Sequence, residues 1–381
     1  MLWPSILAGL ESLYAGLFNF TLAHWVMFAI GCLLIYLGIA KGFEPLLLVP
    51  IGFGAILTNV PFSGVMDENG FLRVLLEAGI LTELFPLLIF VGIGALTDLG
   101  PLLENPKIFL FGAAGQFGIF LTLLLALLLG FTPLEALSIG IIGACDGPTA
   151  IYVTTNYAPQ LLGSISVAAY SYMSLVPLIQ PPIMRALTTQ REKQIVMPMV
   201  KHSVSRTTKL VFPIAVTAFT AVIAPLGASL MGMFMFGNLM RESGVMDRLA
   251  KASSNELANI VTLLLGLTIG ATMQAEAFLR VQTLGIFALG FIAISLDTVM
   301  GVLFGKLMCF LTGGKVNPLI GAAGISALPM AARVVQNEGL RYNKKNHLLM
   351  HAMGANTGGQ LGSIMAAAIM LSIVNALGIQ P

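Results

Sequence analysis

Charged side chains are scarce in this chain: Asp, Glu, Lys and Arg make up only 9% of its 381 residues. Hydrophobic residues make up 57%, and the mean hydropathy is +0.92. A soluble domain needs a more polar surface than this composition provides. The formal net charge of +2 is spread over short loops, which argues against nucleic acid as a partner. The sequence therefore predicts an all-α polytopic membrane protein.

Cysteine is also rare. Cys32, Cys145 and Cys309 lie in apolar stretches at spacings that match no metal or redox motif. We expect them to be small buried hydrophobic residues without a disulfide framework. The first 20 residues lack a basic region and a small-residue cleavage site, so we expect an interfacial segment that is retained and not a signal peptide.

Apolar stretches long enough to cross a bilayer recur along the whole chain. One span needs about 20 apolar residues, and on this rule we expect ten to eleven spans, some of them broken. They lie near residues 23–40, 44–60, 80–97, 108–130, 134–156, 165–184, 210–236, 258–275, 282–304, 316–332 and 347–377.

The longest polar stretch between these spans runs from Arg185 to Lys209 and carries six basic residues against one acid. The positive-inside rule makes it cytoplasmic. Counting crossings from this stretch puts residues 237–256 and 306–315 outside, and residues 276–280 and 333–345 inside. The same stretch divides the chain into N-terminal spans (1–77), a first repeat half (78–184), a cytoplasmic basic linker (185–209) and a second repeat half (210–381).

Glycine and proline interrupt one apolar segment in each half. The first is Gly-Ala-Cys-Asp-Gly-Pro-Thr at 143–149, and the second is Asn-Pro-Leu-Ile-Gly-Ala-Ala-Gly-Ile-Ser at 317–326. The tripeptide Ile-Gly-Ala also recurs between the halves at offsets of 176 and 178 residues. Such matches also arise because packed membrane helices are rich in Gly and Ala. We expect two inverted repeats, each with a broken helix, and an ion site near mid-membrane.

Asp146 is the best-placed candidate for that site, because a carboxylate in an apolar segment must face a cavity, pair or bind an ion. Sodium prefers oxygen ligands, which unwound helices and polar side chains supply. Further candidates are Thr149, Tyr170, Tyr172, Asn317, Ser326, Asn356 and Thr357. Tyrosines near span ends also serve as interfacial anchors, and the glycine-rich run at Asn356 also fits a packing kink. Asp297 lies in an uninterrupted segment, which favours a pairing or packing role.

Four motifs resemble the beta subunits of the sodium-pumping, biotin-dependent decarboxylases. They are Gly-Ala-Cys-Asp-Gly-Pro-Thr at 143–149, Tyr-Ser-Tyr-Met-Ser-Leu-Val-Pro at 170–177, the run from Asn317 to Arg333, and His-Ala-Met-Gly-Ala-Asn at 351–356. The likeness covers nearly the whole chain. One departure is Ala355, where the family pattern has proline before Asn356.

The resemblance implies a subunit that decarboxylates carboxybiotin, takes up a proton and exports Na+. It implies Na+ ligands at Asp146, Tyr170, Asn317, Ser326 and Asn356. It also implies proton handling at Tyr172, with Gly321 and Arg333 in the site region. A stand-alone cation/proton antiporter or organic-anion symporter remains an alternative, since it uses the same kind of broken helices.

Partners are required, because the chain contains no Met-Lys-Met biotinylation site and no carboxyltransferase-like soluble segment. The resemblance implies biotin carrier and carboxyltransferase subunits, a small membrane-anchor subunit and further copies of this chain, in the cytoplasmic membrane of a prokaryote. Family members serve decarboxylases of oxaloacetate, methylmalonyl-CoA, malonate or glutaconyl-CoA.

Arg333 is the candidate residue for receiving the carboxybiotin carboxylate. It ends the second broken segment and precedes the basic loop of Arg341, Lys344 and Lys345, on the predicted cytoplasmic side. A guanidinium stays charged and binds a carboxylate through two hydrogen bonds. The alternative is a residue that only fixes topology.

Overall fold

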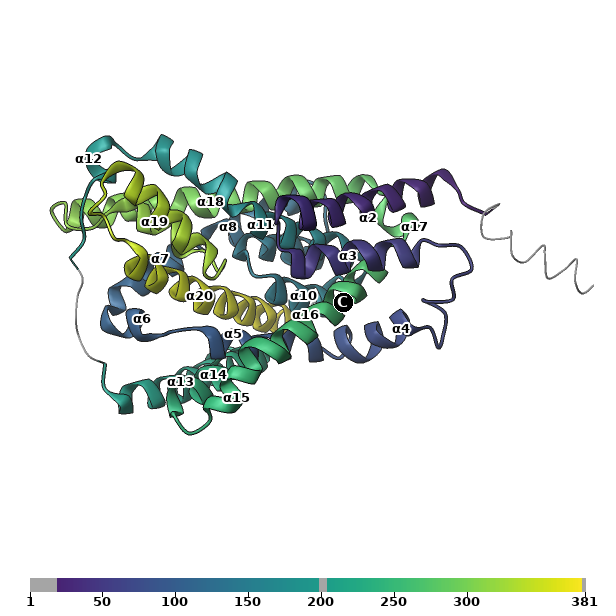
Figure 1. Cartoon of the computed structure of the whole chain (residues 1–381), viewed down its shortest axis with the longest axis horizontal. Helices are drawn as coiled ribbons and strands as arrows, with labels where there is room; N and C mark the ends of the chain where they lie inside the picture. Colours follow the sequence, from purple (N-terminus) through teal and green to yellow (C-terminus); the bar gives the residue numbers. More distant parts are fainter. Residues whose placement is uncertain (1–18, 199–203, 379–381) are drawn as a thin grey trace, which may run out of the picture.

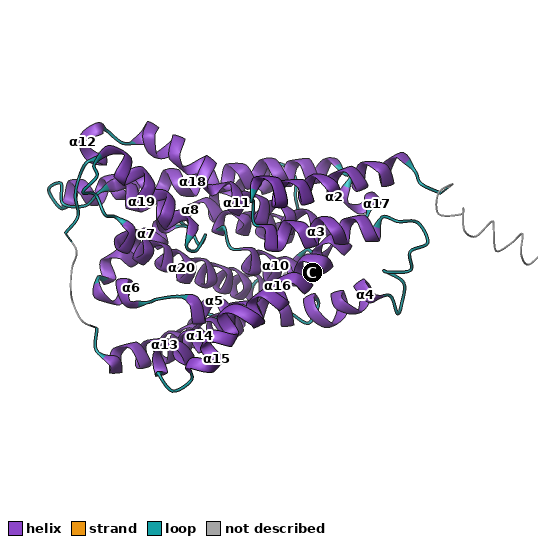
Figure 2. Ribbon diagram, viewed as in Figure 1, coloured by secondary structure: helices purple, strands orange, loops and turns teal. Residues whose placement is uncertain are grey.

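The computed structural model of the chain describes residues 19–198 and 204–378, and over these ranges it contains helices and no strand (Figure 2). The predicted all-helical membrane class is confirmed. Seven helices of the described residues are long and apolar enough to cross a membrane, or eight if Phe71–Ile80 and Leu84–Leu96 form one bent span. That number is below the ten to eleven expected. Residues 1–18 of the expected interfacial segment lie outside the described residues.

The α-helices follow one another along the chain as labelled in Figure 1. They are α2 (Leu22–Lys41), α3 (Pro45–Thr58), α4 (Phe71–Leu75), α5 (Leu84–Leu96), α6 (Gly100–Glu104), α7 (Phe109–Ala114), α8 (Phe117–Leu128), α9 (Pro133–Gly140), α10 (Gly147–Tyr157), α11 (Leu162–Leu187), α12 (Gln190–Lys193), α13 (Arg206–Ile223), α14 (Ala228–Ser243), α15 (Asp247–Ala252), α16 (Ala258–Ala271), α17 (Ala275–Phe278), α18 (Val281–Leu311), α19 (Met330–Tyr342) and α20 (Leu349–Ala376). Short 3-10 helices are η2 (Pro106–Ile108), η3 (Ile141–Ala144), η4 (Pro159–Leu161), η5 (Pro225–Gly227) and η7 (Pro318–Gly324), and π-helical turns are η1 (Leu76–Ile80) and η6 (Ser253–Leu257).

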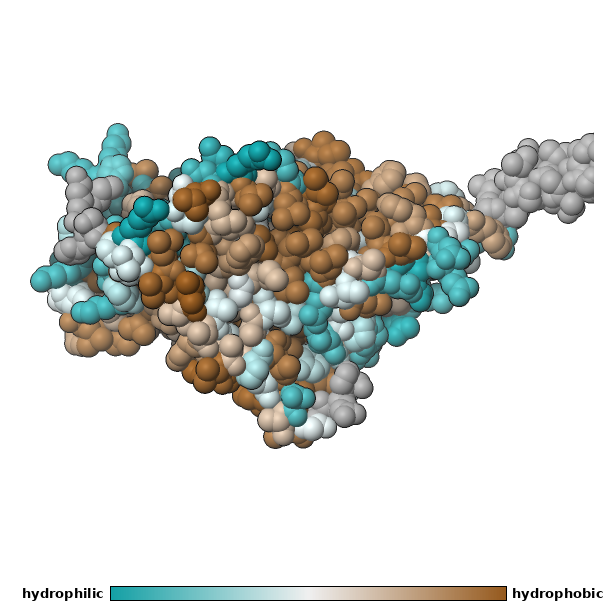
Figure 3. Space-filling model, turned by 90° about the horizontal axis from the view of Figure 1, so that it is seen from below, coloured by the Kyte–Doolittle hydropathy of each residue, from teal (hydrophilic) through white to brown (hydrophobic). Residues whose placement is uncertain are grey.

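The outer helices present apolar side chains outward, as a lipid-facing surface requires. Leu22 of α2, Val222 of α13 and Leu284 of α18 are each more than two-thirds exposed. Figure 3 shows a broad brown apolar area over the middle of one face of the molecule. Cys145 and Cys309 are buried as predicted, whereas the prediction for Cys32 was wrong because it lies on the exposed side of α2.

Glycine allows two pairs of helices to touch backbone to backbone. A Cβ added at Gly54 of α3 would lie 2.3 Å from the carbonyl oxygen of Leu267 in α16. One added at Gly94 of α5 would lie 1.9 Å from the carbonyl oxygen of Phe234 in α14. Small residues drive such close helix packing in membranes. The α3–α16 pair joins the predicted N-terminal spans to the second half, the α5–α14 pair joins the two predicted halves, and the inverted repeat itself stays a prediction.

The predicted single span at 210–236 was wrong, because the chain turns back at its middle. Pro225 cannot continue the helix that precedes it, and α13 and α14 form an antiparallel hairpin. Lys209 at the start of α13 forms a salt bridge of 3.1 Å with Glu242 at the end of α14. The end of α14 therefore lies beside the start of α13, so the crossing count that put residues 237–256 across the membrane from the linker fails.

The second broken segment enters and leaves at the linker end of the molecule. At its start, the Asn317 side chain donates a hydrogen bond to the Ile195 carbonyl in the linker at 2.9 Å. At its end, Glu338 of α19 accepts two hydrogen bonds from Arg185, at 2.7 and 2.8 Å. Lys306, before the segment, donates to the Leu187 carbonyl at 2.9 Å. Residues 317–342 thus form a re-entrant hairpin and not the span predicted at 316–332, and the prediction that residues 306–315 lie opposite the linker was wrong.

The first broken segment is also re-entrant. Gln160, after α10, donates to Glu135 at the start of α9 at 3.3 Å, so residues 133–160 begin and end at the same level. The continuous 26-residue α11 then leads from there to the linker, a rise of about 39 Å. The two hairpins therefore enter from opposite ends. Residues 276–280 lie at the end opposite the linker, since Thr283 hydrogen-bonds Ser164 near the start of α11, and their predicted inside location was wrong.

Candidate cation site

The tips of the two re-entrant hairpins meet inside the protein. Pro148 has no N–H, so it cannot form a helical hydrogen bond with the carbonyl of Ala144, four residues earlier. Its ring would also clash with that carbonyl in a continuous helix. That carbonyl accepts a hydrogen bond of 3.1 Å from the Ser326 N–H of the second hairpin. Cys145 between η3 and α10 adopts a φ of 56°, in the left-handed region. The break places Asp146 at the start of α10, beside the contact between the tips.

Asp146 is the acid at this contact, and it is only 3% exposed. Its Oδ2 accepts hydrogen bonds from the Thr149 hydroxyl at 2.6 Å, the Gln360 amide at 2.6 Å and the Ser363 hydroxyl at 3.2 Å. Among the described residues no Lys, Arg or His forms an ion pair with it. Three neutral donors favour the ionised form but leave its charge uncompensated. The site is therefore suited to bind a cation or a proton.

Helix α20 presents neutral polar side chains from one face. Asn356, Gln360 and Ser363 are spaced by four and three residues, so they share that face. The Asn356 amide donates to the carbonyl of Ile325, and its buried Oδ1 has no hydrogen-bond partner in the described part of the chain. The Ser326 hydroxyl donates to the carbonyl of Gly359 at 3.0 Å. The structure thus brings Asp146, Thr149, Ser326 and Asn356 into one buried region, as their prediction as ligands requires.

The two tyrosines face different neighbours. Tyr170 is 2% exposed, and a Cβ added at Gly147 would lie 2.1 Å from its ring, so it packs directly behind Asp146. The Tyr172 hydroxyl donates to the carbonyl of Phe287 in α18 at 2.5 Å. Residues two apart point to different sides of a helix. The structure therefore places Tyr170 beside Asp146 and turns Tyr172 toward α18.

Two further predicted site residues lie on the second hairpin, one before its tip and one after it. Asn317 stands at the linker end of η7, where its Oδ1 accepts from the Leu319 N–H at 3.0 Å. Seven residues of 3-10 helix rise about 14 Å, which separates Asn317 from Ser326. Arg333 lies in the first turn of α19 and is exposed, with no ion pair among the described residues. Gly321 of η7 packs on Gly301 of α18, where an added Cβ would lie 1.9 Å from the Gly301 carbonyl oxygen.

Sequence reasoning missed three residues at the tips. Gln360 and Ser363 bind the Asp146 carboxylate directly, and their spacing from Asn356 is the signal that identifies them. Gln116, in the turn between α7 and α8, donates to the carbonyls of Gly324 at 3.3 Å and Gly359 at 3.2 Å. A lone glutamine in an apolar segment gives no such signal.

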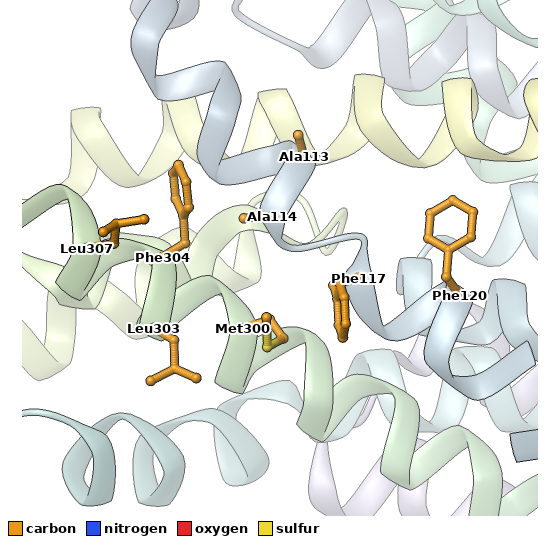
Figure 4. A pocket seen from close by; sticks show the side chains of 8 residues that line it. All are labelled: Ala113, Ala114, Phe117, Phe120, Met300, Leu303, Phe304 and Leu307. Carbon is orange, nitrogen blue, oxygen red and sulfur yellow. The ribbon is translucent and has the colours of Figure 1, made fainter. Parts of the chain in front are cut away.

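An apolar cavity of about 390 Å³ lies elsewhere, between α7, α8 and α18 (Figure 4). It is lined by Ala113, Ala114, Phe117, Phe120, Met300, Leu303, Phe304 and Leu307. None of these side chains has an oxygen to coordinate a cation. The cavity is therefore not the cation site.

Comparison with known proteins shows which sequences this chain is similar to. Residues 23–374 match the family model described as the Na+-transporting oxaloacetate decarboxylase beta subunit. The methylmalonyl-CoA decarboxylase subunit beta of Veillonella parvula is 54% identical over 361 residues, covering 95% of this chain and 96% of that protein. The glutaconyl-CoA decarboxylase subunit beta of Acidaminococcus fermentans is 54% identical over 360 residues, covering 94% and 96%. The oxaloacetate decarboxylase beta chain 2 of Salmonella typhi is 46% identical over 423 positions, covering 95% and 98%.

Proposed function

We propose a residue-level mechanism on the premise that this chain belongs to the family of Na+-transporting oxaloacetate decarboxylase beta subunits. The family resemblance read from the motifs is thereby confirmed, and the stand-alone transporter is not favoured. The chain is a multi-pass membrane subunit of a sodium-pumping, biotin-dependent decarboxylase with other subunits. Which of its residues couple decarboxylation to Na+ export is our proposal.

Asp146 is the coupling residue in this proposal. The observation that carries it is the buried carboxylate at the junction of two opposed re-entrant hairpins. Its Oδ2 accepts from three neutral donors, and no cationic side chain of residues 19–198 or 204–378 pairs with it. When it is ionised, Asp146 binds Na+. When it is protonated, it loses the charge that holds the ion. One group therefore exchanges Na+ for H+.

Decarboxylation drives this exchange. Breaking the bond between the biotin nitrogen and the carboxylate releases carbon dioxide, and the nitrogen takes up a proton. A proton that reaches Asp146 from the outside displaces Na+ outward. That proton then passes to the biotin nitrogen. Each Na+ exported beyond the number of protons taken up costs about 2.3 kcal/mol at 100 mV, and the decarboxylation supplies this free energy.

The other ligands are neutral oxygens around the tips. Ser326 and Asn356 supply them from the second hairpin and α20, and Tyr170 supplies a hydroxyl behind Asp146. Tyr172 is a proton-handling hydroxyl on the side of α18. Asn317 acts at the linker end of the second hairpin, where an ion enters the unwound segment.

Arg333 receives the carboxybiotin carboxylate. It is exposed and unpaired within the described residues, on the hairpin whose tip reaches the Asp146 region. The nearby Arg185 is less suited to this role, since its charge is already neutralised by the salt bridge with Glu338. A free guanidinium in the first turn of α19 offers the two parallel hydrogen bonds that a carboxylate accepts. Biotin itself is carried by a partner.

The partners in this proposal are biotin carrier and carboxyltransferase subunits, a small membrane-anchor subunit and further copies of this chain. Among the possible complexes, we favour an acyl-CoA decarboxylase. The alignments with the methylmalonyl-CoA and glutaconyl-CoA relatives span 361 and 360 positions. The oxaloacetate relative aligns over 423, more than the 381 residues of this chain, so that relative contains insertions that this chain lacks.

The purified complex tests this function. Decarboxylation of oxaloacetate, methylmalonyl-CoA, malonate and glutaconyl-CoA is measured with and without sodium, and with avidin as the inhibitor of biotin. We expect sodium-stimulated, avidin-sensitive turnover of an acyl-CoA, and copurification of a biotinylated protein. Turnover of none of the four substrates, with no biotinylated partner, would contradict the proposal.

A further inference from the structure

The predicted span at 108–130 is interrupted, and the interruption lies next to the first re-entrant hairpin. Helix α7 ends at Ala114, α8 begins at Phe117, and Figure 4 shows the turn between them. The first N–H groups of α8 have no partner within their own helix. In a membrane such a break persists where the protein supplies the missing partners.

Asp297 of α18 supplies one of these partners. Its Oδ1 accepts a hydrogen bond from the Gly118 N–H of α8. The side chain is fully buried, and its Oδ2 has no hydrogen-bond partner among the described residues. A Cβ added at Gly143 of η3 would lie 2.9 Å from that oxygen. Asp297 is thus wedged between α8 and the hairpin that carries Asp146.

The charge of Asp297 is not balanced by any neighbouring cation. No Lys, Arg or His in the described parts of the chain pairs with it. Its titratable neighbour is Cys145 of the η3–α10 junction, which lies within electrostatic range of both Asp297 and Asp146. A buried carboxylate with one donor and no counter-ion is costly. Asp297 therefore needs a bound cation or a proton.

The packing around Asp297 distinguishes these two ligands. Sodium needs several oxygen ligands around it. The backbones of Gly118 and Gly143 lie too close to the two carboxyl oxygens of Asp297 to leave such space, since a Cβ added at either glycine would lie under 3 Å from one of them. A proton takes no such space. The cavity of Figure 4 borders the same region, through Phe117 next to Gly118 and Met300 one turn along α18. Its apolar walls disfavour water and the ionised form on that side.

We propose that Asp297 is a second proton-carrying residue, separate from the Na+-exchanging Asp146, and that it holds a proton in the arrangement seen here. The step is –COO⁻ + H+ → –COOH, with no other bond made or broken. This inference rests on the proposed function, in which each decarboxylation consumes a proton. Protonated Asp297 stores one beside the hairpin tip and keeps η3 packed on α8. Its ionisation places an uncompensated charge against Gly143 and loosens this packing.

Infrared difference spectroscopy on the purified complex tests the proposal directly, because a protonated carboxylic acid has a carbonyl-stretch band of its own. The difference is taken between acidic and alkaline pH, in the presence of sodium. We expect the band of a buried acid in the wild type and its loss in Asp297→Asn, which keeps the size of the side chain. The matched control is Thr298→Val, which removes a neighbouring buried hydroxyl whose hydrogen bond goes to its own helix. A full band in Asp297→Asn would overturn the proposal.

A second measurement on the wild type does not depend on whether the variant folds. A hydrophobic carbodiimide adds to protonated carboxyl groups in apolar surroundings, and peptide mass spectrometry locates the adduct. We expect an adduct at Asp297 whose yield is independent of sodium, and an adduct at Asp146 that sodium suppresses. Sodium protection at Asp297 would place a cation there and overturn the proposal. If sodium protected neither residue while the Asp297 band persisted, the assignment of Asp146 would fail and that of Asp297 would stand.

Discussion

The Ser326 N–H donates a hydrogen bond of 3.1 Å to the Ala144 carbonyl and so joins the tips of two hairpins that enter the protein from opposite ends. The bond exists because Pro148 frees that carbonyl from its own helix. Two residues further on, the buried carboxylate of Asp146 lies at this junction and accepts hydrogen bonds from Thr149, Gln360 and Ser363. Ion binding and the contact between the two halves are therefore physically coupled.

Gln360→Ala is expected to raise the sodium concentration needed for half-maximal decarboxylation. The Gln360 amide donates to Asp146 Oδ2 at 2.6 Å, and a hydrogen bond to a charged group contributes about 1.5–3 kcal/mol, or about tenfold or more in affinity. The measurement is sodium-dependent decarboxylation at pH 7. Ser372→Ala on the same helix is the control, because its hydroxyl bonds only its own helix. An unchanged sodium requirement in Gln360→Ala would show that this contact does not act on the ion.

Ser326→Ala and Asn317→Ala are expected to differ. Ser326 lies at the tip, so its loss raises the sodium requirement, and the loss of its hydrogen bond to the Gly359 carbonyl costs about 1 kcal/mol of stability. Both polar atoms of the Asn317 side chain already hold the hairpin to the linker and to η7, so its loss lowers stability by about 1–3 kcal/mol. Sodium titrations and thermal unfolding of the two variants separate a ligand from a scaffold residue. A raised sodium requirement with normal stability in Asn317→Ala would identify it as a ligand.

Tyr170→Phe is expected to weaken sodium stimulation, because it removes a hydroxyl that lies against Gly147, next to Asp146. Tyr172→Phe removes the hydroxyl bonded to the Phe287 carbonyl and is expected to slow decarboxylation and cost about 1 kcal/mol of stability. Initial rates over a range of sodium concentrations distinguish the two effects. Wild-type kinetics in both variants would show that neither tyrosine hydroxyl takes part in sodium binding or proton transfer.

The pair of Arg185 and Glu338 predicts a pH dependence of stability at the linker end. The hydrogen bond and charge of Arg185 lower the pKa of Glu338 from its ordinary value of 4.5. Stability from this pair is thus fully present above pH 4.5 and is lost as the pH falls below it, through the lowered pKa. Glu338→Gln should melt at a lower temperature than the wild type at pH 7, with a difference that shrinks in acid. Glu77→Gln, in an exposed pair with Arg73, serves as the control and should change little.

The sequence alone predicted the chemistry of the junction better than its topology. Asp146 is identified from the sequence because an acid beside Gly147 and Pro148 in an apolar segment usually has a functional role. The same apolar run gives no information on whether a broken segment crosses or returns, since hydropathy counts residues and does not record direction. Only contacts such as Gln160 with Glu135 and Asn317 with the linker distinguish re-entry from a span.

The hydrogen-bond partners of Asp146 that sequence reasoning missed have a similar explanation. Gln360 and Ser363 are single polar residues in a 28-residue apolar helix, where polar side chains also serve helix packing. Their spacing from Asn356 predicts a polar face on this helix. That face is recognised as part of the site only when the first hairpin is known to pack against it. The role of Asp297 becomes visible only from the break between α7 and α8, and no proline in the sequence marks that break.

Asp146→Asn, reconstituted with its partner subunits in proteoliposomes, is the most direct test of the central claim. Decarboxylation and the uptake of radioactive sodium are measured together in the same vesicles. Because asparagine neither ionises nor carries an exchangeable proton, we predict that both activities are lost while the complex still assembles. Decarboxylation and sodium uptake at the wild-type rate would contradict the account.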